Sequence, residues 1–286
     1  MRAVEILEPD AWQARAAAHE RRVAAWTGPY LRRRERGEAH PVEDFLFTYY
    51  SNRPGRLARW HPGADVLLRG ARDVGPDYRR TDDGALLDTA KLVERRRTSI
   101  EWTAKLLRAT ADRPAHFGCF GLHEWAMVYR TPEIRHEAWP LRLDADEIAA
   151  VVDERGVRCS HFDAFRFFTP AARPLNTLQP TRDAQHDLEQ PGCLHANMDL
   201  YKWAYKLSPL VPSELVADCF ALARDVRAVD MRASPYDLAA LGYPPIRIET
   251  PAGRAEYAAI QRGFADRAAP LRARLSAACE NLLVTR

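Results

Sequence analysis

The sequence has no apolar run close to the roughly 18 consecutive residues that a membrane-spanning helix needs, although 47% of its 286 residues are hydrophobic. No charged-then-apolar leader stands at the N-terminus, so we expect no membrane partner and a cytoplasmic location. The formal net charge is only +3, which excludes the overall basic field of a committed nucleic-acid binder. The apolar content is ample for a core, and an ordinary globular protein is expected.

Cysteine is scarce and shows no pairing pattern. The five cysteines are far apart and include no C-x-x-C pair, which argues against a disulfide framework and against a thiolate zinc site. The absence of C-x-x-C-H excludes covalently attached haem. An H-E-x-x-H zinc motif is also missing, because Met127 stands where its second histidine would be in LHEWAMVYR.

Apolar residues at helical spacing predict a mainly α protein. Asp144 and Glu147 have the spacing of a capping box and should begin a helix that Gly156 ends. Further helices are expected at residues 10–26, 89–111, 194–207 and 213–229, and from 254 to 283 with an interruption at Pro270.

A minor strand component is expected beside the helices. Residues 246–250 are predicted as a short strand, residues 157–170 as either a buried strand or a core helix, and residues 64–88 as a long loop or a small irregular excursion. No repeat, low-complexity tract or linker divides the chain. The sequence therefore predicts a single predominantly helical domain over residues 1–286.

Histidines in apolar or aromatic surroundings are the strongest functional signal. Four of the nine histidines are of this kind: His116, His123, His161 and His195. In contrast, His136 and His186 lie among charged residues and are expected at the surface.

His195 follows a Pro-Gly turn and shares helical spacing with Asp199, Lys202 and Lys206. One interpretation is that this stripe is simply the solvated face of a helix. The functional interpretation makes His195 a ligand for haem or a metal, with Asp199 one turn away holding the other ring nitrogen.

A second metal-ligand pattern is His161 with Asp163, two residues apart. On an extended strand both would share one face, and with His195 or His116 they would form a two-histidine, one-carboxylate iron site. The same spacing also occurs by chance.

A non-covalent haem b pocket is a further interpretation. It would combine His195 with the phenylalanines around Phe165 and with arginines such as Arg166 that can meet the haem propionates. The alternative is that this aromatic segment is ordinary core.

Other charged residues are candidates for catalysis or substrate binding. Glu124, if buried, is a candidate acid or base, and its alternative role is a salt bridge to an arginine. Arg53, Asp230 and Arg232 are expected next to turns and are candidate substrate anchors, with helix capping and surface ion pairs as the alternative.

Four segments, HPVEDFLFTYYSNRPGRLARWHPG, HFGCFGLHEWAMVYR, HFDAFRFFTPAARPLN and EQPGCLHANMDLYKWAYKLSP, carry a family resemblance. Through them nearly the whole chain resembles an actinobacterial family labelled 3-methyladenine DNA glycosylase. The resemblance implies removal of damaged bases from DNA. Of the hairpin found in helix-hairpin-helix glycosylases, the chain has only Pro191-Gly192 and the downstream Asp199.

Two hypotheses follow. The first is a haem- or non-haem-iron-dependent oxygenase for a small aromatic or amino-acid-like substrate, with haem b or iron bound by His195. His116, His123 or His161 would then line the distal side.

The second hypothesis is a metal-free DNA base-lesion N-glycosylase of the 3-methyladenine type, with Asp199, Asp163 or Glu124 as its catalytic carboxylate. DNA is a partner only under this alternative. A non-catalytic binding protein is the third interpretation, and the residues leave a homo-oligomer open.

Overall fold

The computed structural model describes residues 4–132, 134 and 138–284. Of these, 57% are helical and 7% are strand, which confirms the mainly α class with a minor strand component. The longer helices are α1 (Pro9–Glu35), α4 (Thr89–Ala111), α6 (Ala145–Arg155), α10 (Leu200–Leu207), α11 (Ser213–Ala233) and α12 (Pro251–Val284). The short helices are α2 (Phe45–Tyr49), α3 (Pro54–Ala58), α5 (Leu122–Ala126), α7 (Phe162–Phe165), α8 (Gln185–Leu188) and α9 (Leu194–Met198).

The chain groups into two compact units, each built from separate segments. Unit 1 contains the described residues of 1–107, 200–221 and 271–286, and unit 2 contains those of 108–199 and 222–270. The expectation of one domain over residues 1–286 stays a prediction.

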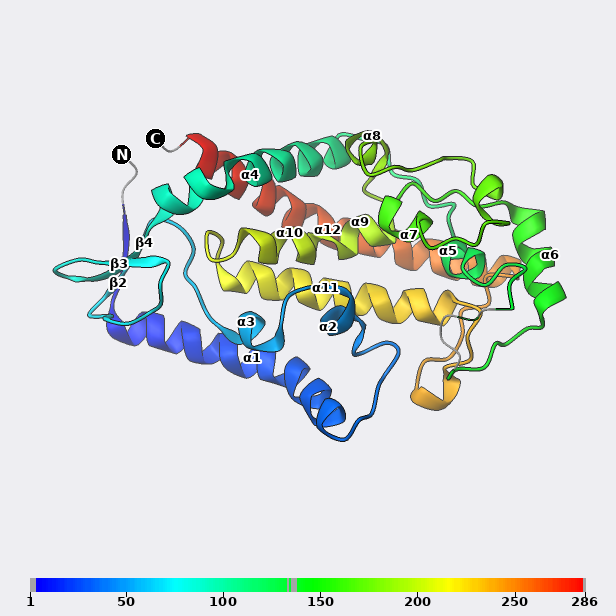
Figure 1. Cartoon of the computed structure of the whole chain (residues 1–286), viewed down its shortest axis with the longest axis horizontal. Helices are drawn as coiled ribbons and strands as arrows, with labels where there is room; N and C mark the ends of the chain where they lie inside the picture. Colours follow the sequence, from blue (N-terminus) through cyan, green and yellow to red (C-terminus); the bar gives the residue numbers. More distant parts are fainter. Residues whose placement is uncertain (1–3, 133, 135–137, 285–286) are drawn as a thin grey trace. The chain divides into compact units, whose positions relative to one another are not determined.

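Unit 1 carries the strand component. The strands β1 (Glu5–Leu7), β2 (Val66–Arg69), β3 (Tyr78–Arg80) and β4 (Gly84–Leu87) form one sheet in the order β1-β2-β4-β3, beside the N-terminal end of α1 (Figure 1). β1 runs parallel to β2, and β4 is antiparallel to both of its neighbours. The loop predicted for residues 64–88 is therefore wrong, because three short strands bury a small core around Leu68 and Ala85.

Gly84 allows two of these strands to meet. A Cβ atom at this position would lie 2.1 Å from the carbonyl oxygen of Leu68, so only glycine fits. A strand this short, held by a close backbone contact, has too little alternation of apolar and polar residues for sequence analysis to detect it.

Most predicted helices are present. α4 has the predicted bounds, and α6 begins with the predicted capping box, in which Asp144 accepts a hydrogen bond from the Glu147 backbone N–H at 2.8 Å. The predicted interruption at Pro270 is wrong, because α12 continues through it. Proline already holds φ near the helical value, so its main cost is one backbone hydrogen bond.

Two further expectations are corrected in unit 2. The strand expected at 246–250 is absent: Ile246 and Ile248 alternate into the core, but the Ile246 N–H donates to the carbonyl of Arg232 rather than to a partner strand. The open choice for 157–170 is settled as a short helix, α7, preceded by extended chain.

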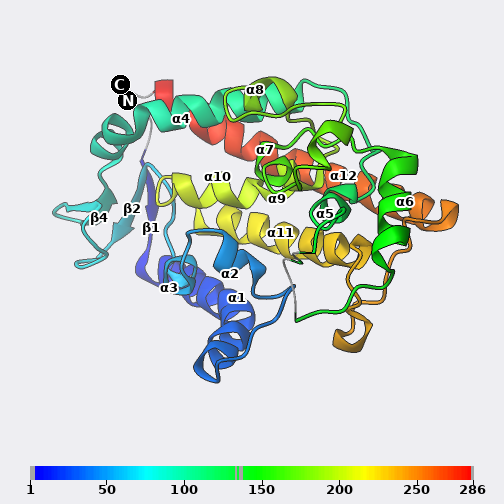
Figure 2. The ribbon, with the colours of Figure 1, turned by 45° about the vertical axis from the view of Figure 1, so that its right-hand side comes forward.

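Short helices dominate the middle of unit 2. In both Figure 1 and Figure 2, α5, α7 and α9 lie between α8 and the C-terminal half of α11.

None of the helices in the described part of the chain combines the length and the apolar character of a membrane span.

Candidate metal centre

Three histidine side chains meet in unit 2. His123 lies on α5 and His195 on α9, and His161 immediately precedes α7. The centroid of the His195 ring is 4.4 Å from that of His123 and 5.3 Å from that of His161. The structure thus brings together three of the four histidines that the sequence places in apolar surroundings.

α5 is fixed against the end of α11 by close backbone contacts. Gly121, just before α5, has φ of +72°, and a Cβ atom there would lie 3.2 Å from that of Ala233. The fully buried Trp125 donates its indole N–H to the carbonyl of Ala233 at 2.9 Å. These contacts hold His123 next to Asp230.

His195 is positioned by the Pro-Gly turn that precedes it. A Cβ atom on Gly192 would lie 2.6 Å from the carbonyl oxygen of His116, so only glycine fits there. The Gln190 side chain accepts from the backbone N–H of His116 at 2.9 Å and of Gly192 at 2.7 Å. Gln261 donates to the Gly192 carbonyl at 2.6 Å. The turn is therefore braced from both sides.

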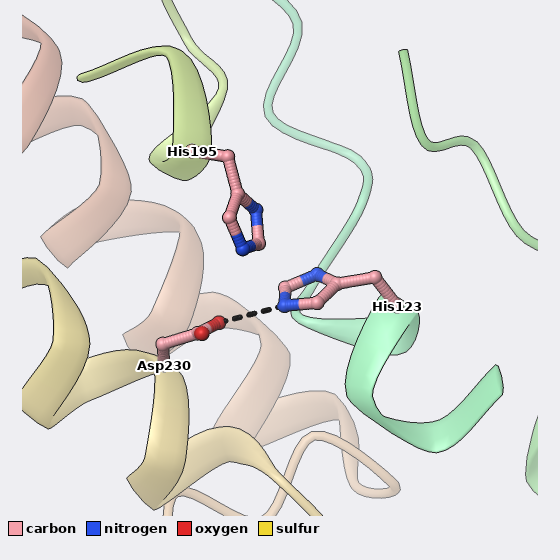
Figure 3. Close-up of side chains that lie close together, drawn as sticks. All are labelled: His123, His195 and Asp230. Carbon is pink, nitrogen blue, oxygen red and sulfur yellow. Dashed lines mark ion pairs between the residues drawn. The ribbon is translucent and has the colours of Figure 1, made fainter. Parts of the chain in front are cut away.

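His123, His195 and Asp230 form what we name the first ligand set. Figure 3 shows the two rings and the carboxylate, from α5, α9 and α11, pointing toward one another, and one donor atom from each lies within 4.8 Å of the others. Nε2 of His123 is 2.9 Å from Oδ1 of Asp230, an ion-pair distance. Two donors bound at about 2.1 Å to one ion lie roughly 3.0 Å apart at a right angle, so this spacing is also compatible with a shared metal.

The pKa values within the first ligand set are strongly shifted. Burial lowers the pKa of His195 well below its ordinary value, and His123 adds to this effect. Burial opposes the charge on His123, but Asp230 outweighs it and raises the pKa of His123. Burial alone would raise the pKa of Asp230, but His123 outweighs it and holds that pKa well below its ordinary value. The shifts of His195 and Asp230 favour the neutral imidazole and the ionised carboxylate, which are the forms that bind metals, whereas the shift of His123 favours its protonated form.

Arg227 supplies a buried positive charge beside the set. Its Nη1 donates to Glu124 at 2.9 Å and to Oδ2 of Asp230 at 3.2 Å, with all three side chains nearly inaccessible to solvent. The structure thus gives Glu124 the arginine partner that was the alternative to a catalytic role. Oδ1 of Asp230 faces His123 while Oδ2 faces Arg227.

His161, Glu189 and Asp199 form what we name the second ligand set. Nε2 of His161 lies 3.3 Å from Oδ2 of Asp199 and 3.4 Å from Oε1 of Glu189, and all three side chains are buried. Gln185 fixes Glu189 by donating to the same Oε1 at 2.6 Å. This set contains one imidazole and two carboxylates.

A cavity of about 530 Å³ lies beside these residues. Its lining includes the apolar Phe117, Leu178 and Leu188 and the basic Arg113 and Arg158. Ser160 and Gln190 also line it, and they are the chain neighbours of His161 and Glu189. Two residues that line the cavity are therefore adjacent in sequence to ligands of the second set.

Several predicted site residues have other roles. Asp199 faces His161 instead of orienting His195, because the helix predicted over 194–207 is interrupted at this residue. The shared strand face considered for His161 and Asp163 is not formed: Asp163 lies in α7 and pairs with Arg166 at 3.3 Å, outside both ligand sets.

The remaining predicted residues are dispersed. Phe165 is buried and packs on Phe168 at 5.1 Å between ring centroids. His116 is exposed and lines the cavity. Arg232 donates to the carbonyl of Pro244 at 2.8 Å.

The other two predicted anchors lie in different surroundings. Arg53 is exposed at the start of α3, in unit 1. Asp230 is not next to a turn but inside α11, in the first ligand set. His186 is partly exposed as expected, and His136 lies outside the described residues.

Sequence analysis missed Glu189 and Arg227. Arg227 stands three residues before Asp230, a spacing at which helical side chains form ion pairs, so a signal for it was available. Glu189 stands beside a Pro-Gly turn, where an exposed charge is the ordinary expectation.

No protein-family model, curated protein or solved structure matches the chain.

Proposed function

We propose that this protein is a non-haem-iron oxygenase for a small aromatic or amino-acid-like substrate, with iron held by His123, His195 and Asp230. The first ligand set carries the proposal, since its two imidazoles and one carboxylate present donor atoms within 4.8 Å of one another. This donor combination with open positions is typical of non-haem Fe(II) oxygenases. Iron, when bound, would supply oxygen activation at the positions that the protein leaves open.

The surroundings of His195 favour iron over haem. A haem needs a wide flat slot at its axial histidine, but the rings of His123 and His161 lie 4.4 Å and 5.3 Å from the His195 ring. Arg166, the predicted propionate partner, instead pairs with Asp163 and is 42% exposed.

The cavity beside the site supports the substrate class. Its volume of about 530 Å³ is in the range of small-molecule sites, and its apolar residues suit an aromatic or aliphatic body. Arg113 and Arg158 suit an acidic group on that body. The five cysteines are free, which supports the reducing, cytoplasmic location that belongs to this proposal.

The glycosylase alternative has weaker support. It keeps the family resemblance, but it needs a carboxylate facing the extruded base. The carboxylate that lines the cavity is that of Asp187, whereas Glu124 and Asp199 are buried against Arg227 and His161.

The test begins with protein expressed with added iron and a haem precursor, followed by an absorption spectrum and metal analysis. We expect bound iron without a Soret band, and loss of that iron in Asp230→Asn and His195→Ala. Nitric oxide, which binds iron at positions open to oxygen, should give a high-spin Fe–NO signal by electron paramagnetic resonance, with a shape that changes on adding aromatic amino acids.

The control is His19→Gln, which alters a buried histidine in unit 1 whose Nε2 contacts the carbonyl of Leu57 at 2.9 Å. This variant should keep its iron. A Soret band would favour the haem form of the hypothesis. Iron-free protein that releases 3-methyladenine from methylated DNA would overturn the proposal and establish the glycosylase.

A further inference from the structure

We infer that the second ligand set, His161, Glu189 and Asp199, binds a second divalent metal ion, so that unit 2 holds a dinuclear centre. This inference rests on the proposed function, because it places the second ion beside the iron of the first ligand set. The ligands would be one imidazole nitrogen and two carboxylate oxygens.

The distances in the second ligand set are those of donors around an ion. Charge-assisted hydrogen bonds are about 2.7–2.9 Å long, whereas His161 Nε2 is 3.3 Å and 3.4 Å from its two carboxylate oxygens. Bonds of about 2.1 Å to a common ion separate two donors by roughly 3.0 Å at a right angle and roughly 3.4 Å at a tetrahedral angle. Nε2 of His161 is thus almost equally distant from the two carboxylate oxygens, as expected for donors around a shared cation.

Charge supports the same assignment. The side chains of Glu189 and Asp199 are each 2% exposed, and two carboxylates buried together repel each other at a high desolvation cost. A divalent cation between them would neutralise both charges. A protonated His161 carries one positive charge against these two negative charges.

The two ligand sets are physically joined. The ring of His195, in the first set, stacks on that of His161 in the second, with 24° between the ring planes. His195 and Asp199 are also one helical turn apart, and the Asp199 N–H donates to the His195 carbonyl at 2.8 Å. A displacement of His195 therefore affects Asp199 through a single helical turn.

Hydrogen bonds position Glu189 of the second set. Gln185 orients Glu189 from outside, as outer hydrogen-bond partners do for metal-binding carboxylates. Arg113 donates to the backbone carbonyl of Glu189 at 3.0 Å.

The experiment is an anaerobic titration of metal-free full-length protein with Fe(II), followed by desalting and metal analysis. We expect about two ions per chain in the unmodified protein and about one in either Glu189→Gln or Asp230→Asn. The matched control is Glu249→Gln, in which a partly buried glutamate paired with Arg142 in the same unit is neutralised. It should keep two ions.

A second readout uses Mn(II) on the unmodified protein, so that it does not depend on any variant folding. Two equivalents should give a spectrum by electron paramagnetic resonance that is broadened by the interaction between two nearby ions, which one equivalent does not give. Saturation at one ion, unchanged in Glu189→Gln but lost in Asp230→Asn, would overturn the dinuclear centre while leaving the proposed function intact. Absence of any bound metal would overturn both.

Discussion

Arg227 is buried to 2% exposure and faces two carboxylates. Replacing it with methionine in metal-free protein keeps the volume but leaves Glu124 and Asp230 without this cation. Loss of one partner from a buried ion pair typically costs about 3–5 kcal/mol. We therefore expect Arg227→Met to lower the free energy of unfolding by that amount, measured by urea denaturation.

Arg267→Met is the control, because Arg267 pairs with Asp225 in the same unit but both side chains are 51% exposed. Its cost should stay below about 1 kcal/mol, as for exposed pairs in general. Equal costs in the two variants would mean that the buried arginine contributes no more than a surface one.

His61, in unit 1, makes stability depend on pH. Burial, together with Arg59 and His19, lowers its pKa from 6.5 to about 4, against the opposing effect of Asp77. Its Nδ1 meets the hydroxyl of Tyr78 at 3.0 Å. Between pH 6.5 and about 4 the unfolded chain binds a proton that the folded chain does not, so stability falls as the pH falls through this window.

Replacing His61 with asparagine removes this titration and keeps a polar atom near Tyr78. Between pH 6.5 and 4 we expect His61→Asn to lose less stability than the unmodified protein, by up to about 3 kcal/mol. Urea midpoints across that range measure the difference. Parallel curves for the two proteins would contradict the assignment.

At the scale of single residues, sequence analysis identified the histidines of the site but not the side chains that they contact. Buried histidines need compensating groups, so apolar surroundings were enough to single out His123, His161 and His195. Their partners lie far along the chain, as with His123 and Asp230 at 2.9 Å. No local spacing reports such a contact.

The Pro-Gly turn before α9 is the element on which the site depends most. Gly192→Ala would place a methyl group 2.6 Å from the carbonyl oxygen of His116, and backbone would have to shift. Such overpacking typically costs about 1–3 kcal/mol. We expect that loss in urea denaturation, together with reduced iron content, because His195 begins the helix that follows.

Gly118→Ala is the matched control in the same segment of unit 2. A Cβ atom on Gly118 would meet nothing within 4 Å, so its stability and iron content should stay close to those of the unmodified protein. If Gly192→Ala behaved in the same way, the turn would not be what positions His195.

Helices with strong periodicity were predictable, and irregular elements were not. α4 follows its apolar spacing from end to end, and the capping box of α6 announces its start. The helix predicted over 194–207 is interrupted at Asp199, where ψ is −10°, and this residue turns its carboxylate to a distant histidine. Tertiary contacts of this kind override local propensity.

At the scale of the whole chain, apolar periodicity was sufficient for the mainly α class, while the site depends on topology. The first ligand set draws donors from both segments of unit 2, and the second joins His161 to Glu189 and Asp199 farther along one segment. A metal bound there would stabilise the folded protein, because the unfolded chain does not bring these segments together.

The last prediction concerns metal removal. At free Fe(II) about one hundred times the dissociation constant, each bound ion adds about 2.7 kcal/mol, or roughly 4–5 °C in Tm for a chain of this size. Metal-free protein should therefore melt lower by at least this margin, and Asp230→Asn should lose the share that the first ligand set contributes. Hydrogen exchange should show the largest gain of protection in residues 108–199 and 222–270, because these segments supply every ligand. An unchanged Tm on adding Fe(II) would contradict metal binding at this centre.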